Sequence, residues 1–320
     1  MHRFRWRRRR AIAIALFAFV ALIATPALAE APPGKSARIG ASNASVAVGQ
    51  SVVLRGSFPG ASNAPIEIRH RGQGEATWRA LARNRTGARG RYSVEVEPRR
   101  SGFWRAELVD QPITQGASES EQSSTAESTR IDRGTGSQRI AVRSRTETKV
   151  RGRHSRVARV VEVSGKVTPA GARRKVVVSI GEATETTSAG RSGKFRVEWK
   201  APDTGSYPVR VRARPNREAT GSSDRAGAVT VYREALASWY GPGLYGNSMA
   251  CGGTLTPATV GVAHKALPCD TKLRLRYGGR TVSALVVDRG PYAGNREFDL
   301  TYATKRALGF PDTSTVLTSK

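Results

Sequence analysis

Apolar and polar residues alternate in short runs through the first half of the chain. Runs such as 66–70 and 92–96 alternate between apolar and polar residues and are bounded by Gly, Pro and Asn. A period of two is typical of antiparallel strands with one buried face, and the spacing of the runs favours a small sandwich. Because no run there has helical periodicity, we predict an all-β module over residues 36–110.

The same pattern returns about one hundred positions later. Residues 90–96 read Gly-Arg-Tyr-Ser-Val-Glu-Val, and residues 193–199 read Gly-Lys-Phe-Arg-Val-Glu-Trp. Each is followed by a Ser/Thr-Gly-x-aromatic step. This self-similarity predicts two tandem copies of one β-sandwich, the second over residues 139–233. The pair resembles the immunoglobulin-like modules common in bacterial surface proteins.

Two segments break the alternation. Residues 116–137 are rich in Ser, Thr, Glu, Gln and Gly and almost free of apolar side chains. Such a segment cannot bury enough surface to offset its ordering entropy, so we predict a flexible linker over 111–138. At the start of the chain, an arginine-rich stretch, an apolar run over 11–24 and Ala27-Leu28-Ala29 have the layout of a secretory signal peptide over 1–29. An uncleaved anchor is the alternative.

Residues 236–320 have a different pattern. Residues 272–277 alternate strictly, Gly278-Gly279 follows, and a second apolar run leads into Asp288. This order predicts a β-hairpin. Residues 302–308, ended by Gly309, predict a short helix. Short strands and glycine-rich turns make up the rest of this third domain.

Candidate chemistry is concentrated in this last domain, in four short motifs. They are Ser-Trp-Tyr-Gly at 238–241, Ala-His-Lys at 263–265, Val-Asp-Arg-Gly-Pro-Tyr at 287–292 and Phe-Asp-Leu-Thr at 298–301. Their order resembles that of RlpA-like proteins, which are exported lytic transglycosylases and relatives with a six-stranded double-psi β-barrel shared with expansins. The resemblance covers residues 236–320 and implies an all-β chain with this barrel at its end.

The resemblance places catalytic residues at His264, Asp288 and Asp299. One carboxyl, Asp288, would serve as acid and then as base. His264 would hydrogen-bond the substrate or orient Asp288 across a groove, and Asp299 would either cap the helix or add a second carboxylate. The alternatives are that Asp288 caps its own Gly-Pro turn and pairs with Arg289, and that His264 is structural.

Aromatic and basic residues near these motifs are the candidate substrate contacts. Trp239, Tyr240 and Tyr292 adjoin glycine or proline, where rings can stack on sugar faces. Arg289 and Arg296 suit the carboxylates of peptidoglycan because a guanidinium fork matches a carboxylate. Core packing, most of all for Trp239, and solvated surface arginine are the alternatives.

The two cysteines, Cys251 and Cys269, favour a disulfide, since an exported chain meets oxidising surroundings. A zinc site that adds His264 and a carboxylate is the alternative, but no Cys-x-x-Cys pair is present. We therefore expect no metal. No phosphate loop or ligand cluster indicates a cofactor.

The net charge of +28 adds a possible class of partner. In an exported protein this charge favours anionic wall polymers or lipid headgroups, bound by the immunoglobulin-like modules, over nucleic acid. We expect a monomer located in the periplasm, in the cell wall or outside the cell.

The leading hypothesis is an exported enzyme, a carbon–oxygen lyase, that cuts peptidoglycan glycan strands to 1,6-anhydro ends. An expansin-like protein that binds or loosens the wall without cleavage is the alternative, because one fold supports both. A hydrolase that uses Asp288 and Asp299 together is a third.

Overall fold

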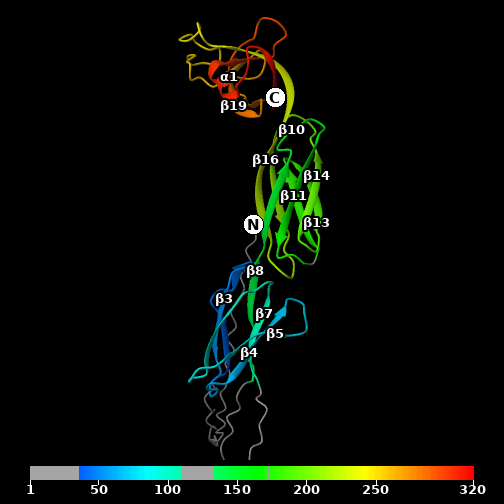
Figure 1. The fold of residues 1–320 in the computed structure, drawn as a ribbon, viewed down its shortest axis with the longest axis vertical. Helices are drawn as coiled ribbons and strands as arrows, with labels where there is room; N and C mark the ends of the chain where they lie inside the picture. The colour runs from blue at the N-terminus through cyan, green and yellow to red at the C-terminus, as the bar shows by residue number, and fades with distance from the viewer. Residues whose placement is uncertain (1–35, 110–132, 172) are drawn as a thin grey trace, which may run out of the picture. The chain divides into compact units, whose positions relative to one another are not determined.

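The computed structural model describes residues 36–109, 133–171 and 173–320 (Figure 1). The predicted signal peptide and most of the predicted linker lie outside the described residues. Within these ranges the protein is all-β apart from one seven-residue helix. It comprises two immunoglobulin-like sandwiches and a six-stranded double-psi β-barrel, which confirms the predicted fold class. No helix in the described ranges is long and apolar enough to span a membrane.

The first sandwich consists of two sheets, in the strand orders β1-β3-β6 and β2-β8-β7-β4-β5. The strands are β1 (Arg38–Ala41), β2 (Ser45–Ala47), β3 (Val52–Ser57), β4 (Pro65–Gly72), β5 (Arg79–Arg85), β6 (Arg91–Val96), β7 (Gly102–Leu108) and β8 (Gln138–Arg143). Side chains of both sheets, among them Leu54, Ile68 and Trp104, form its buried core.

Strand β8 corrects the predicted boundary between the linker and the second sandwich. It pairs with β7 and β2, and Ile140 and Val142 are fully buried in the first core. Residues 138–143 therefore complete the first sandwich, and the predicted start of the second sandwich at residue 139 is wrong. Local pattern could not reveal this, since alternation shows that a strand forms but not which sheet it joins.

The second sandwich has one sheet in the order β14-β11-β9 and another in the order β13-β12-β15-β16, with β10 beside β16. The strands are β9 (Arg145–Arg151), β10 (His154–Arg156), β11 (Val160–Thr168), β12 (Arg174–Ile180), β13 (Ala183–Ala189), β14 (Lys194–Lys200), β15 (Gly205–Ala213) and β16 (Ser222–Tyr240). Its core is dominated by valines, with Phe195 and Trp199.

The predicted repeat corresponds to equivalent structural positions. In the first sandwich Gly56 of β3 lies opposite Tyr92 of β6, and in the second Gly165 of β11 lies opposite Phe195 of β14. In each case the aromatic ring covers the glycine so closely that a Cβ there would collide with it. A glycine covered by a cross-strand ring therefore recurs in both modules.

The barrel is closed by six strands in the cyclic order β16-β20-β17-β19-β18-β21. Strand β16 runs on from the second sandwich, and the other elements are β17 (Gly261–His264), β18 (Lys272–Tyr277), β19 (Arg280–Asp288), β20 (Phe298–Thr301), α1 (Tyr302–Leu308) and β21 (Ser314–Thr318). Val262, Leu275, Val286, Phe298 and Leu300 are at the centre of its core.

The predicted hairpin and helix are both confirmed. Strands β18 and β19 are joined by Gly278 and Gly279, both with positive φ, as a two-residue turn requires. Helix α1 ends at Gly309, whose left-handed backbone closes the last turn.

Candidate functional site

A cleft of about 270 Å³ opens on the barrel beside strands β17, β19 and β20. Asp288 and Asp299 both line it, with Tyr240, Ala263 and Tyr292. Segment 247–249 and Leu255 form part of its wall. The cleft therefore contains two of the three predicted catalytic residues.

Strand register brings the two aspartates together. Ala263 of β17 pairs with Asp299 of β20 on one side and with Asp288 of β19 on the other. The pairing of β17 with β19 shifts by one residue, because Val262 lies opposite Val286 while Ala263 lies opposite Asp288. A bulge of this kind redirects a side chain. It places Asp288, in place of Val287, next to Ala263.

The Asp288 carboxylate is fixed by two backbone donors. Its Oδ1 accepts hydrogen bonds from the backbone N–H groups of Ala250 and Arg289, each at 2.8 Å. The bond from the Arg289 N–H is local, and it agrees with the alternative that Asp288 caps its own Gly-Pro turn. Both backbone bonds end on Oδ1, so neither of them engages the other carboxylate oxygen.

Asp299 does not cap the helix. The N-cap of α1 is Thr301, whose hydroxyl accepts from the backbone N–H of Thr304. The Asp299 carboxylate instead accepts a hydrogen bond from the Ser238 hydroxyl of the paired strand β16 and lines the cleft. Of the two roles weighed for Asp299, the structure supports the second carboxyl in the groove.

The Tyr240 hydroxyl lies near both acids in the same cleft. It is buried and has no protein hydrogen-bond partner of good geometry among the described residues. Burial raises the pKa of this phenol; the negative charge of Asp288, a poorly directed hydrogen bond with that carboxylate and then the charge of Asp299 raise it further. A buried hydroxyl without a partner is costly, so Tyr240 is a donor available to a bound ligand.

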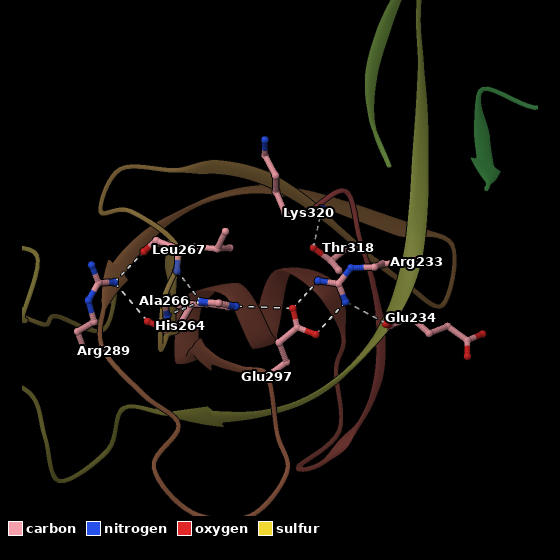
Figure 2. A network of polar contacts seen from close by, with 9 residues as sticks. All are labelled: Arg233, Glu234, His264, Ala266, Leu267, Arg289, Glu297, Thr318 and Lys320. Carbon is pink, nitrogen blue, oxygen red and sulfur yellow. Dashed lines mark hydrogen bonds and ion pairs between the residues drawn. The ribbon is translucent and has the colours of Figure 1, made fainter. Parts of the chain in front are cut away.

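His264 is not among the residues that line this cleft, and its ring nitrogens contact groups other than Asp288. Its Nδ1 accepts hydrogen bonds from the backbone N–H groups of Ala266 and Leu267, at 3.0 and 2.9 Å. Its Nε2 lies 3.6 Å from the Glu297 carboxylate, which pairs with Arg233 (Figure 2). Because side chains alternate along a strand, Ala263 faces the cleft and the next residue does not.

The electrostatics of this network favour a neutral imidazole. Burial lowers the pKa of His264, and Glu297 offsets that effect only in part. Hydrogen bonds from Arg233 lower the pKa of Glu297. Since two amides donate to Nδ1, the proton of the neutral ring is on Nε2, facing Glu297. Glu297 and Arg233 had no motif to mark them in the sequence.

The two arginines predicted to contact substrate are engaged within the protein. Arg289 donates through Nη1 to the carbonyls of His264 and Leu267, and through Nη2 to the sulfur of Cys269. Arg296 donates to the carbonyl of Ala293 in its own loop and does not line the cleft. Arg289 also lines the cleft, so its engaged guanidinium lies at the cleft wall, whereas Arg296 holds its own loop away from the cleft.

The three aromatic candidates divide between the cleft and the barrel core. Tyr240 and Tyr292 line the cleft, and Tyr292 is 83% exposed. Trp239 points to the other face of its strand, where it packs on the barrel core, donates to Asp312 and lies under the Lys305 ammonium. The core-packing alternative therefore describes Trp239.

Cys251 and Cys269 form the expected disulfide. The bond ties the loop that supplies the Ala250 donor to the segment before β18, and Cys269 also accepts from Arg289. The bridge thus holds both residues whose backbone N–H groups donate to Asp288, Ala250 through its loop and Arg289 through Cys269. In the described ranges, no group of His, Cys, Asp and Glu is arranged to hold a metal ion.

Comparisons with known proteins confirm the resemblance for the barrel domain. Residues 233–318 match a family model described as lytic transglycolase. The probable endolytic peptidoglycan transglycosylase RlpA of Synechocystis is 34% identical over 88 residues, 27% of each chain. The endolytic peptidoglycan transglycosylase RlpA of Campylobacter jejuni is 40% identical over 75 residues, 23% of this chain and 27% of that protein. The chain spans about a quarter of the length of these curated relatives.

Proposed function

We propose that the barrel domain cleaves the glycan strands of peptidoglycan by lytic transglycosylation, in an exported protein that remodels the cell wall. The observation that carries the proposal is the pair Asp288 and Asp299, held in one cleft on the two strands that flank β17, in a domain that matches the lytic transglycolase model. The names of the relatives support the substrate class.

The reaction needs one carboxyl that first donates a proton and then accepts one. Protonated Asp288 gives its proton to the glycosidic oxygen as the bond to the anomeric carbon breaks. The 6-hydroxyl of the same sugar then attacks that carbon and loses its proton to Asp288. The products are a new 4-hydroxyl end and a 1,6-anhydro end, and Asp288 is protonated again.

The rest of the cleft supports this sequence of steps. Asp299, hydrogen-bonded by Ser238, adds a second carboxyl close to the electron-deficient carbon of the transition state. The Tyr240 hydroxyl, which has no well-directed protein partner, can hydrogen-bond a sugar oxygen near the two acids. Tyr292, exposed at the rim, offers a face on which a sugar ring can stack.

Binding or loosening of the wall without cleavage is the second candidate function. The two backbone hydrogen bonds to Asp288 favour it, because a carboxylate that only fixes a turn would have the same partners. The exposed Tyr292 serves binding and cleavage equally well.

The experiment is product analysis after incubation of the purified protein with glycan strands. Mass spectra with 1,6-anhydro ends support lytic transglycosylation. Reducing ends in their place would show a hydrolase in which Asp288 and Asp299 act together. Strands that sediment with the protein but remain uncut would show the binding function.

A further inference from the structure

One outer face of the second sandwich is unusually basic. In the sheet β13-β12-β15-β16, the residues that face the core are hydrophobic, including Val176, Val178 and Val211. The alternate residues of β15 face outward, and they include Arg210 and Arg212. Strand register brings further basic side chains to this face.

Arg225 of β16 lies directly opposite Arg210, and Arg214 follows at the end of β15. The four arginines 210, 212, 214 and 225 are all exposed. None of their guanidinium groups has a hydrogen bond or ion pair with another described residue. Like charges placed directly opposite on a sheet are destabilising. The module therefore retains a cluster of like charges that no ion pair within the described residues offsets.

The other sheet of the same module is different. On β14-β11-β9 the outward residues carry both signs, and ion pairs form between Arg196 and Glu162 and between Arg145 and Glu147. The basic character of the chain is thus not spread evenly over this sandwich. It is left uncompensated on one sheet.

The arginine face is also hollowed. A shallow groove of about 800 Å³ runs over it, lined by the four arginines and by small residues such as Ser179, Thr184 and Ser223. Asp224 is the one acid in the lining. Arginines two residues apart on a strand are separated by about 6.6 Å, so the groove presents a row of guanidinium forks, with the hydroxyls of Ser179, Thr184 and Ser223 also in its lining.

We propose that this groove, formed by β12, β15 and β16, binds a linear polymer of phosphate groups. Guanidinium forks match phosphate oxygens in a bidentate manner, and phosphate oxygens also accept hydrogen bonds from hydroxyls. A polymer neutralises several arginines at once and releases its counterions, so it binds far more tightly than a single phosphate. The groove would hold the protein on an anionic polymer while the barrel acts on another substrate.

The test measures binding of the purified full chain to long-chain inorganic polyphosphate as a function of salt. The test variant is Arg210→Ser/Arg212→Ser/Arg225→Ser. The control variant, Arg151→Ser/Lys194→Ser/Lys200→Ser, removes the same charge from outward positions of the β14-β11-β9 sheet. We expect the test variant to bind at least about tenfold more weakly with a shallower salt dependence, and the control variant to stay within about twofold of the parent.

Three results would overturn the proposal. Equal losses in the two variants would mean that net charge, not this groove, attracts the polymer. Equal binding of polyphosphate and of a polyuronate of the same length would remove the preference for phosphate. Stronger binding to phosphatidylglycerol vesicles than to polyphosphate, lost in the test variant, would assign the face to a lipid surface. Lysine in place of serine at positions 210, 212 and 225 should recover only part of the affinity for polyphosphate, since the charge is kept and the guanidinium forks are lost.

Discussion

Asp288 and Asp299 both lie beside Ala263, which pairs with Asp288 on one side and with Asp299 on the other. One strand, β17, therefore lies between the two acids of the cleft, and the shifted register at Val262 decides which residue of β19 reaches it. The arrangement depends on the closed order of the barrel, in which β19 and β20 flank the same short strand. Two motifs some ten residues apart in the chain become one site in this way.

Replacement of Tyr240 by Phe should affect cleavage without harming the fold. The lost hydroxyl is buried and has no good protein partner, so the free energy of unfolding should stay the same or rise by up to about 1 kcal/mol. Cleavage should slow by roughly tenfold to a hundredfold if the hydroxyl bonds the reacting sugar. Thermal unfolding and single-turnover rates measure the two effects, and an unchanged rate would exclude the hydroxyl from the site.

His264 should stabilise the barrel through its acceptor nitrogen Nδ1 and should not contact the substrate. In His264→Ala the N–H groups of Ala266 and Leu267 lose their acceptor, which should cost about 1–2 kcal/mol of barrel stability. His264→Asn places an amide oxygen near the same position and should recover most of that loss. Denaturant titration compares the two. Loss of cleavage in a fully stable Asn variant would instead show that the imidazole contacts the substrate.

The same residue predicts a pH dependence of stability. The pKa of folded His264 is below its ordinary value of 6.5, so the unfolded chain binds more protons and stability falls as the pH drops below about 6.5. Glu297, whose pKa is lowered by Arg233, adds stability above pH 4.5 that is lost as the pH falls further. Melting temperatures from pH 7.5 to 5 should fall more steeply for the parent than for His264→Asn. Parallel curves would contradict this, since His70 and His154 titrate in both proteins.

Removal of the disulfide should weaken the barrel and the cleft together. The Cys251→Ser/Cys269→Ser variant should lose about 3 kcal/mol, the chain-entropy value for a loop of this length. Cleavage should also fall, because the bridge holds the loop whose Ala250 N–H donates to Asp288. Reducing agent should lower the melting temperature of the parent and leave that of the variant unchanged. A parent that melts at the same temperature with and without reductant would contradict the bridge.

The sequence predicted what depends on local pattern. The Gly278-Gly279 turn, the helix ending at Gly309 and the repeated glycine-aromatic strands are each encoded by a few adjacent residues. The nearness of the motifs that contain Asp288 and Asp299 was expected from the family resemblance and not from local pattern.

Features that depend on strand phase and on distant partners could not be predicted. Whether His264 or Ala263 faces the cleft depends on the register of β17, and the fork of Arg289 is taken by carbonyls that no motif marks. The ion pair of Glu297 could not be predicted because its partner Arg233 is 64 positions away. Strand β8 was assigned to the second sandwich because pairing across sheets is a tertiary choice.

The most direct test of the proposed function is the release of 1,6-anhydro ends by Asp288→Asn. Asparagine keeps an oxygen for the N–H groups of Ala250 and Arg289, so the turn should stay folded, but it cannot carry the proton. We predict that the variant sediments with glycan strands as the parent does and releases anhydro ends at least about a hundredfold more slowly. Release at the parent's rate by a folded variant would contradict the assignment of Asp288 as the acid.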